Sequence, residues 1–223
     1  MANRFENLKK MPDGPAARFL ADTPLKLETE LDAPVSATVS VVLTELEEKQ
    51  AWVDMLKVLA AALPAREGVW WACLAARDLP GADASPVLKA TEAWVFGPTE
   101  ENRVTLGEML EAADADDETT LAATAAYYAE GNLGPGDLAE QPAPPGSVAS
   151  CVLGQNLQSL NDEHDAIEWM KYLIDRAVDI ANGGNGRVDK PEPKPPEPED
   201  DDDDDDDEDD VVVAAEENAP AKG

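Results

Sequence analysis

Apolar side chains recur at the pitch of an α-helix in several segments of this chain, and this spacing restricts the fold more than any other feature. In 49–63 the residues expected on one apolar helix face are Trp52, Met55, Leu56, Leu59, Ala60 and Leu63, with Asp54, Lys57 and Ala61 facing away. A second face in 162–182 combines Ala166, Ile167, Met170, Leu173, Ile174, Ala177 and Val178. Alanine, leucine and glutamate are abundant and β-branched runs are few, which favours helices. We therefore expect an all-α fold.

Proline and glycine clusters divide the chain into about eight helices. They are expected at roughly 34–48, 49–63, 65–77, 85–96, 99–113, 119–130, 147–161 and 162–182, and a short helix around 16–20 also fits the sequence. Asp32 is a candidate N-cap for the first, Thr99 for the fifth, and Gly183-Gly184 should end the last. Short turns favour antiparallel neighbours, in an irregular helical bundle or a short stack of antiparallel helical hairpins. The tripeptide Ala-Trp-Val occurs at 51–53 and again at 93–95, which indicates a repeat of helical hairpins.

The helix expected at 65–77 should be central, because it is apolar on most of its circumference. Its adjacent Trp70 and Trp71 point about 100° apart and cannot share one narrow stripe. Tryptophan is common in buried cores and is also enriched at binding hot spots. Trp71 is therefore a candidate both for the core and for a partner-contacting surface.

Composition divides the chain into three parts. Residues 1–31, which contain the breaker run 11–15, are expected to form a loosely attached arm, and residues 32–186 the helical domain. Residues 187–223 begin with alternating proline and charge and continue as unbroken acid over 199–210. Such a run repels itself and should form a disordered tail, in which Val211–Ala215 is the one apolar run.

The charge of the chain narrows the classes of partner. Its formal net charge is −31, of which residues 187–223 carry −13 and the remainder −18. Both parts would repel nucleic-acid phosphates and anionic lipid, so direct binding to either is not expected. The first fifteen residues lack the apolar stretch of a signal peptide, and no segment is long enough to span a membrane. We expect a cytoplasmic protein with reduced thiols at its two cysteines, Cys73 and Cys151.

Three groups of residues invite a chemical interpretation, and none has the pattern that the chemistry requires. His164, the one histidine, lies among acids and could share a metal with Glu168, but a zinc site needs three or four ligands. A solvated helix start explains it better. The acidic run 114–118 lacks the ligand spacing of a calcium loop, and Cys73 lies among bulky apolar residues that should suppress its reactivity. We expect no catalytic residue, metal or cofactor, and hence no enzyme.

Three stretches of the sequence together resemble a bacterial family of uncharacterised helical proteins. They are Leu-Ala-Ala-Ala-Leu-Pro-Ala-Arg-Glu-Gly-Val-Trp-Trp-Ala-Cys at 59–73, Glu-Ala-Trp-Val at 92–95 and Pro-Thr-Glu-Glu-Asn-Arg at 98–103. The family is the domain of unknown function 6931, and the resemblance covers about residues 32–182. It implies an all-α domain with no assigned activity, and it suggests an accessory role beside type VI secretion systems. Gly68 stands where the motif would have alanine, which suggests close packing there.

These features favour a non-enzymatic adaptor or chaperone-like interaction protein. The acidic tail would serve either for solubility, as a salt-sensitive tether for a basic protein, or for weak divalent-cation binding. Two groups of residues are expected to bind a partner. One is Trp71 of the helical domain, and the other is the acidic run of the tail: Asp200, Asp201, Asp202, Asp203, Asp204, Asp205, Asp206 and Asp207. The alternative is an acidic nucleic-acid mimic that inhibits a basic DNA-binding protein.

Overall fold

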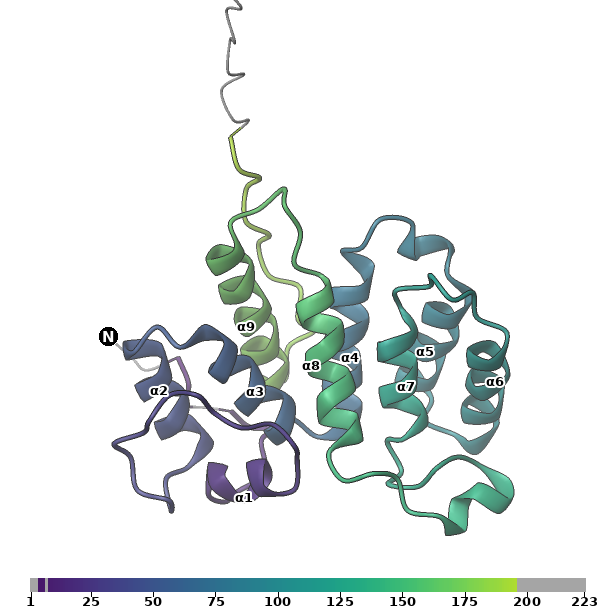
Figure 1. The fold of residues 1–223 in the computed structure, drawn as a ribbon, viewed down its shortest axis with the longest axis horizontal. Helices are drawn as coiled ribbons and strands as arrows, with labels where there is room; N and C mark the ends of the chain where they lie inside the picture. Colours follow the sequence, from purple (N-terminus) through teal and green to yellow (C-terminus); the bar gives the residue numbers. More distant parts are fainter. Residues whose placement is uncertain (1–3, 7, 196–223) are drawn as a thin grey trace, which may run out of the picture.

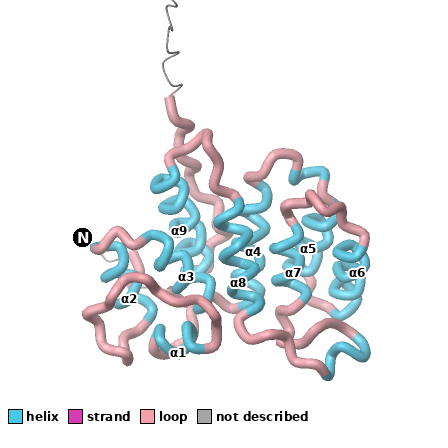
Figure 2. Tube along the Cα trace, in the orientation of Figure 1, coloured by secondary structure: helices cyan, strands magenta, loops and turns pink. Residues whose placement is uncertain are grey.

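The computed structural model describes residues 4–6 and 8–195, and these residues form nine α-helices and no strand (Figures 1 and 2). The prediction of an all-α fold is confirmed. The helices are α1 (Ala16–Ala21), α2 (Val39–Glu48), α3 (Trp52–Ala62), α4 (Ala65–Arg77), α5 (Pro86–Phe96), α6 (Glu100–Glu111), α7 (Thr120–Tyr127), α8 (Ser147–Gln158) and α9 (Ala166–Asn182).

Helix α4 lies at the centre, as its apolar circumference predicts. It packs against α5, α7, α8 and α9, which belong to both halves of the molecule. In Figure 1, α1, α2, α3 and α9 lie to one side of it and α5, α6 and α7 to the other. One contiguous hydrophobic core runs through both halves.

The helix ends follow the local signals in most places. The side chain of Ser85 caps α5 by accepting the Leu88 N–H, and that of Thr99 caps α6 by accepting the Asn102 N–H. Gly183, with φ +99°, ends α9 as expected.

Three helix starts were predicted at least three residues too early: those of α2, of α3, which begins at Trp52 rather than near Lys49, and of α9. Helix α2 begins at Val39 rather than near Pro34, because the preceding segment makes other contacts: the Ala37 N–H donates to the Pro34 carbonyl, and the Ala37 carbonyl accepts the Ala16 N–H. Helix α9 begins at Ala166, where the Asp165 carboxylate accepts the N–H groups of Ile167 and Glu168. Because α2 begins at Val39, with Thr38 at the N-cap position, Asp32 caps no helix.

The repeated Ala-Trp-Val tripeptide does not mark equivalent positions. Ala51 precedes the first turn of α3, whereas Ala93-Trp94-Val95 lies in the last turns of α5. The tripeptide therefore gives no support to a stack of repeated hairpins.

The N-terminal arm is not loosely attached in the residues that the structure describes. Phe5 is completely buried, and Ala16 belongs to the core. The Lys10 N–H donates to the carbonyl of Ala181 at the end of α9, 2.8 Å away. Arg4 pairs with Glu47 of α2 and Asp175 of α9.

Two carboxylate–lysine clamps hold the second part of the arm. Asp54 of α3 accepts the N–H groups of Glu28 and Thr29 at 2.9 and 2.8 Å and pairs with Lys57 at 2.8 Å, while Lys57 donates to the Lys26 carbonyl. Asp54 was predicted to face away from the core, but only 4% of it is exposed.

The second clamp repeats this arrangement one helix earlier. Glu45 of α2 accepts the N–H groups of Asp32 and Ala33, and its partner Lys49 donates to the Glu30 carbonyl. The end of the arm and the two residues after it thus supply backbone groups, and the helices supply the charged side chains that satisfy them.

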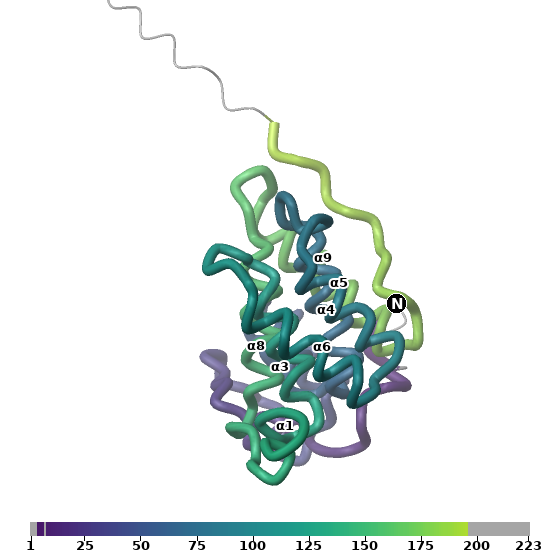
Figure 3. The backbone as a smooth tube through the Cα atoms, turned by 90° about the vertical axis from the view of Figure 1, so that its right-hand side faces the viewer, coloured from purple at the N-terminus to yellow at the C-terminus, as the bar shows by residue number. Residues whose placement is uncertain are grey.

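The chain after α9 continues as a strap, defined here as residues 186–194, along one face of the body (Figure 3). Its Gly186 is buried and donates its N–H to Asp179. Lys190 pairs with Asp78 at 3.3 Å and lies 4.9 Å from the centre of the Trp169 ring, and the Lys194 N–H donates to the Glu163 carbonyl. The disordered tail was predicted to begin at residue 187, but the described chain stays in contact with the body to Lys194.

Candidate functional site

An exposed phenylalanine beside a half-buried tryptophan is the most conspicuous surface feature of the described residues. Phe96, at the end of α5, is 71% exposed, and its ring lies 5.5 Å from the ring of Trp70 on α4. The two rings form part of a groove of about 250 Å³, which we call the aromatic groove; it is lined by Lys10, Arg66, Glu67, Trp70, Val95, Phe96, Ile180, Gly184 and Asn185. Exposed aromatic side chains in a concave surface are typical of a binding site.

Contacts between distant segments of the chain fix the walls of the aromatic groove. The Arg66 Nε donates to the Val95 carbonyl at 2.7 Å and so fixes the end of α5 beside the start of α4. The Trp70 Nε1 donates to the Asn185 carbonyl at 2.9 Å, which fixes the indole beside the start of the strap. Lys10 of the arm completes the rim and pairs with Glu67 at 3.1 Å. The groove is therefore built from four separate parts of the chain.

Sequence reasoning missed the part played by Phe96. The residue stands just before Gly97-Pro98, where a helix is expected to end, and an apolar ring at such a terminus is a weak signal of exposure. Nothing in the spacing pairs it with Trp70, since 26 positions separate them. Only the approach of α4 and α5 creates the pair.

Trp71 is not part of a surface, so the hypothesis that it contacts a partner is wrong. Its side chain is 0% exposed, and its Nε1 donates to the Leu173 carbonyl of α9 at 3.0 Å. Of the two alternatives left open by the sequence, the core is where Trp71 lies. Its neighbour Trp70, about 100° around the helix, faces the groove instead.

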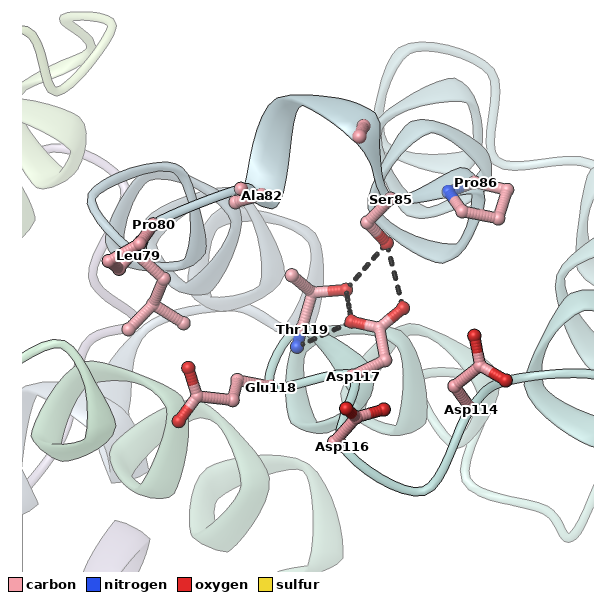
Figure 4. Close-up of a pocket in the computed structure, with 12 residues that line it drawn as sticks. Leu79, Pro80, Ala82, Ser85, Pro86, Asp114, Asp116, Asp117, Glu118 and Thr119 are labelled. Carbon is pink, nitrogen blue, oxygen red and sulfur yellow. Dashed lines mark hydrogen bonds between the residues drawn. The ribbon is translucent and has the colours of Figure 1, made fainter.

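A second hollow, of about 350 Å³, lies where the acidic connector 114–118 meets the loop before α5 (Figure 4). Asp117 binds within the protein: its carboxylate accepts the Thr119 N–H at 2.9 Å, the Thr119 hydroxyl at 2.6 Å and the Ser85 hydroxyl at 2.9 Å. Burial acts to raise the pKa of Asp117, but the hydrogen bonds from Thr119 and Ser85 outweigh it and lower that pKa. Asp114 and Glu118 lie on opposite sides of Asp117 in Figure 4. The hollow thus has an acidic wall that ties two loops together.

His164 is not at a solvated helix start. It is only 4% exposed, its ring centre lies 4.5 Å from that of Trp169, and its Nδ1 is 2.9 Å from the side-chain oxygen of Asn161. Its aromatic ring covers the indole, which explains why it is buried beside acids that face solvent. Among residues 4–6 and 8–195, no three histidine, cysteine or carboxylate side chains are grouped so that they could hold a metal ion.

The two cysteines are both free thiols whose reactivity is reduced by their surroundings. Cys73 is completely buried in α4, and burial raises the pKa of its thiol far above the ordinary range. Cys151 of α8 is half-buried, and burial raises the pKa of its thiol as well.

The predicted partner-binding residues Asp200–Asp207 lie outside the described residues. Within the described ranges, no helix combines the length and the apolar character that a membrane crossing requires.

Comparison with known proteins finds one family and no individual relative. No curated protein matches the chain, and no solved structure matches it. The model of a family of unknown function, DUF6931, matches residues 42–181, from within α2 to near the end of α9 and including the Trp70 face of the aromatic groove. The chain therefore belongs to the DUF6931 family.

Proposed function

We propose that this protein is a non-enzymatic adaptor that binds a partner protein through the aromatic groove, while the acidic residues Asp200–Asp207 attract a basic segment of a partner. The observation that carries the proposal is the tilted contact between the exposed ring of Phe96 and the half-buried ring of Trp70. An aromatic ring that is 71% exposed costs hydration free energy in the isolated protein, and a partner that covers it recovers this energy.

Two further features support an adaptor. The helices that carry the groove belong to one packed core, so the surface is pre-organised and little conformational entropy is lost when a partner binds. The acidic run over 199–210 provides long-range attraction for a basic partner, which raises the association rate more than the final affinity. The groove would then supply the short-range contacts.

The test compares three full-length proteins as bait: the wild type, Phe96→Ser and Leu138→Ser. Leu138 is the matched control, because it is 45% exposed and lies in the 3-10 turn Gly136–Glu140, away from the groove. A partner identified by the wild type is purified, and its dissociation constant is measured. We expect Phe96→Ser to weaken binding at least tenfold, which corresponds to about 1.4 kcal/mol, and Leu138→Ser to leave it unchanged.

The same titration at low and high salt examines the tail. Replacing Asp200–Asp207 by asparagine should slow the association of the partner at low salt and change its association rate little at high salt.

Equal affinity of Phe96→Ser and wild type for every partner would remove the groove from the proposal. A captured DNA-binding protein that DNA fragments displace would instead favour the nucleic-acid mimic, and a component of a type VI secretion system would support the accessory role that the family resemblance suggests.

A further inference from the structure

The aromatic groove has an apolar floor and a mixed-charge rim. We call its apolar lining residues Trp70, Val95, Phe96 and Ile180 the floor, and we call its charged lining residues, Arg66 and the ion-paired Lys10 and Glu67, the rim. In a chain with a net charge of −31, a rim with two cations and one acid is locally positive. Such a groove suits an apolar segment that is flanked by acidic residues.

The chain itself contains a segment of this kind. Residues 211–215 read Val-Val-Val-Ala-Ala, preceded by Asp209-Asp210 and followed by Glu216-Glu217. It is the one apolar run in residues 187–223, and it lies outside the described residues. Its composition therefore matches the floor and the rim of the groove together.

The length of the chain allows this segment to return to the groove. Asn185 lines the groove, and ten residues later Pro195, the last described residue, lies at most roughly 36 Å from it. From Pro195 to Val211 are sixteen residues, which can span roughly 53 Å. The return is therefore within reach for any path of the strap.

We propose that the segment Asp209–Glu217 binds in the aromatic groove of its own chain, with the valine side chains on Trp70 and Phe96 and the flanking acids toward Arg66 and Lys10. Because Glu67 offsets one cation of the rim, apolar contact supplies most of the affinity and the charges set the orientation. A tether of this length provides an effective concentration in the millimolar range, so weak intrinsic binding suffices. The segment then competes with any partner that uses the groove and leaves Asp200–Asp207 in a closed loop.

The inference does not depend on the proposed function, since it concerns the isolated chain. The experiment records the methyl NMR signals of Val211, Val212 and Val213 in the full-length protein and in a free peptide of residues 205–223. Ring currents of Trp70 and Phe96 should shift these signals away from their free-peptide positions. In full-length Phe96→Ser they should return to those positions, and in Leu138→Ser they should stay shifted.

A second pair of variants examines the tail side without touching the folded body. Val212→Asp should move the indole N–H signal of Trp70, because it places a charge in the apolar run, whereas Asn218→Asp adds the same charge outside the run and should leave that signal in place. Valine signals that coincide with those of the free peptide in the wild type would overturn the proposal. Shifts that disappear on dilution would overturn it as well, because they would assign the segment to the groove of a second copy.

Discussion

At the scale of single residues, Asp54 shows how a buried carboxylate can secure a segment that has no regular structure. Burial acts to raise the pKa of Asp54, but the hydrogen bonds from Lys57, Thr29 and Glu28 outweigh it, and the pKa lies below its ordinary value of 3.8. The ionised carboxylate is therefore favoured in the folded protein. Its contribution to stability is present above pH 3.8 and is lost as the pH falls through the lowered pKa.

The first prediction replaces this carboxylate. Asp54→Asn should reduce the free energy of unfolding at pH 7 by about 1–3 kcal/mol, because a charge-assisted hydrogen-bond network loses its charge and Lys57 loses its nearest carboxylate. Urea titrations between pH 7 and pH 3 would measure this.

The pH dependence separates the clamp from a general effect of mutation. The difference between wild type and Asp54→Asn should narrow as the pH falls from 3.8 through the lowered pKa, where the carboxylate of the folded wild type becomes neutral as well. Asp137→Asn, at an exposed position of the 3-10 turn, is the control and should follow the wild type throughout. A difference between Asp54→Asn and wild type that stays constant with pH would contradict the assignment.

The second prediction concerns Gln50, which has a left-handed backbone conformation with φ +55°. It follows α2, where the Gln50 N–H donates to the Glu47 carbonyl and the Ala51 N–H to the Leu46 carbonyl. This pattern is the helix end at which glycine is normally found. Gln50→Gly should raise the free energy of unfolding by about 0.5–1 kcal/mol, because relief of the left-handed strain exceeds the entropic cost of glycine.

Urea denaturation would detect this gain, and Gln50→Ala is the control. Alanine also has a Cβ atom and does not relieve the strain, so its stability should not rise. A glycine variant that is no more stable than the alanine variant would show that the turn is not strained.

At the scale of helices, two glycines that carry the same cost in helix propensity have different surroundings. Gly68 of α4 faces α8, and a Cβ atom there would lie 3.4 Å from Val152, an ordinary contact. Gly107 of α6 faces Tyr127, and a Cβ atom there would lie 2.8 Å from the ring. The close packing expected at Gly68 from the family motif therefore leaves room for a methyl group, whereas Gly107 does not.

The third prediction compares alanine at these two positions. Gly68→Ala should raise the free energy of unfolding by up to about 1 kcal/mol, because alanine has the higher helix propensity. Gly107→Ala should lower the free energy of unfolding, because displacing the Tyr127 ring costs more than the gain in helix propensity. Thermal and urea unfolding of both variants would measure the effects. A stabilised Gly107→Ala, or a clear loss for Gly68→Ala, would contradict the packing described for these helix pairs.

At the scale of the whole molecule, charge opposes compactness. The ion pairs of the body are mostly part-exposed, and each contributes about 0–1 kcal/mol. Repulsion among a net charge of −31 acts over the whole chain. Salt weakens both, but it screens the long-range repulsion most strongly, since the screening length falls from about 30 Å at 0.01 M to about 10 Å at 0.1 M.

The fourth prediction follows from this balance. The thermal midpoint of the full-length protein should rise as the sodium chloride concentration increases from about 10 mM to about 150 mM, because this salt shortens the screening length and weakens the repulsion. A non-ionic solute at equal osmolarity is the control and should not reproduce the rise. A midpoint that falls over this range would show that the local ion pairs outweigh the repulsion.

The sequence alone determined the helical class, the order of the helices and most of their ends, because these features depend on local physics. Apolar spacing, proline stops and capping hydroxyls such as those of Ser85 and Thr99 act within a few residues. Helix α4 is the best case: its predicted range and its central place both agree with the structure.

Only the tertiary structure decided which of these side chains are buried and which are exposed. Trp71 is buried because its indole reaches Leu173, 102 positions away, and Phe96 is exposed because no described segment covers the end of α5. Asp54 and His164 are buried because the arm and Trp169 lie against them. Such contacts join distant segments, so a periodicity that identifies one apolar face of a helix cannot identify the neighbour that completes it. The aromatic groove belongs to this second class, because four separate parts of the chain form it.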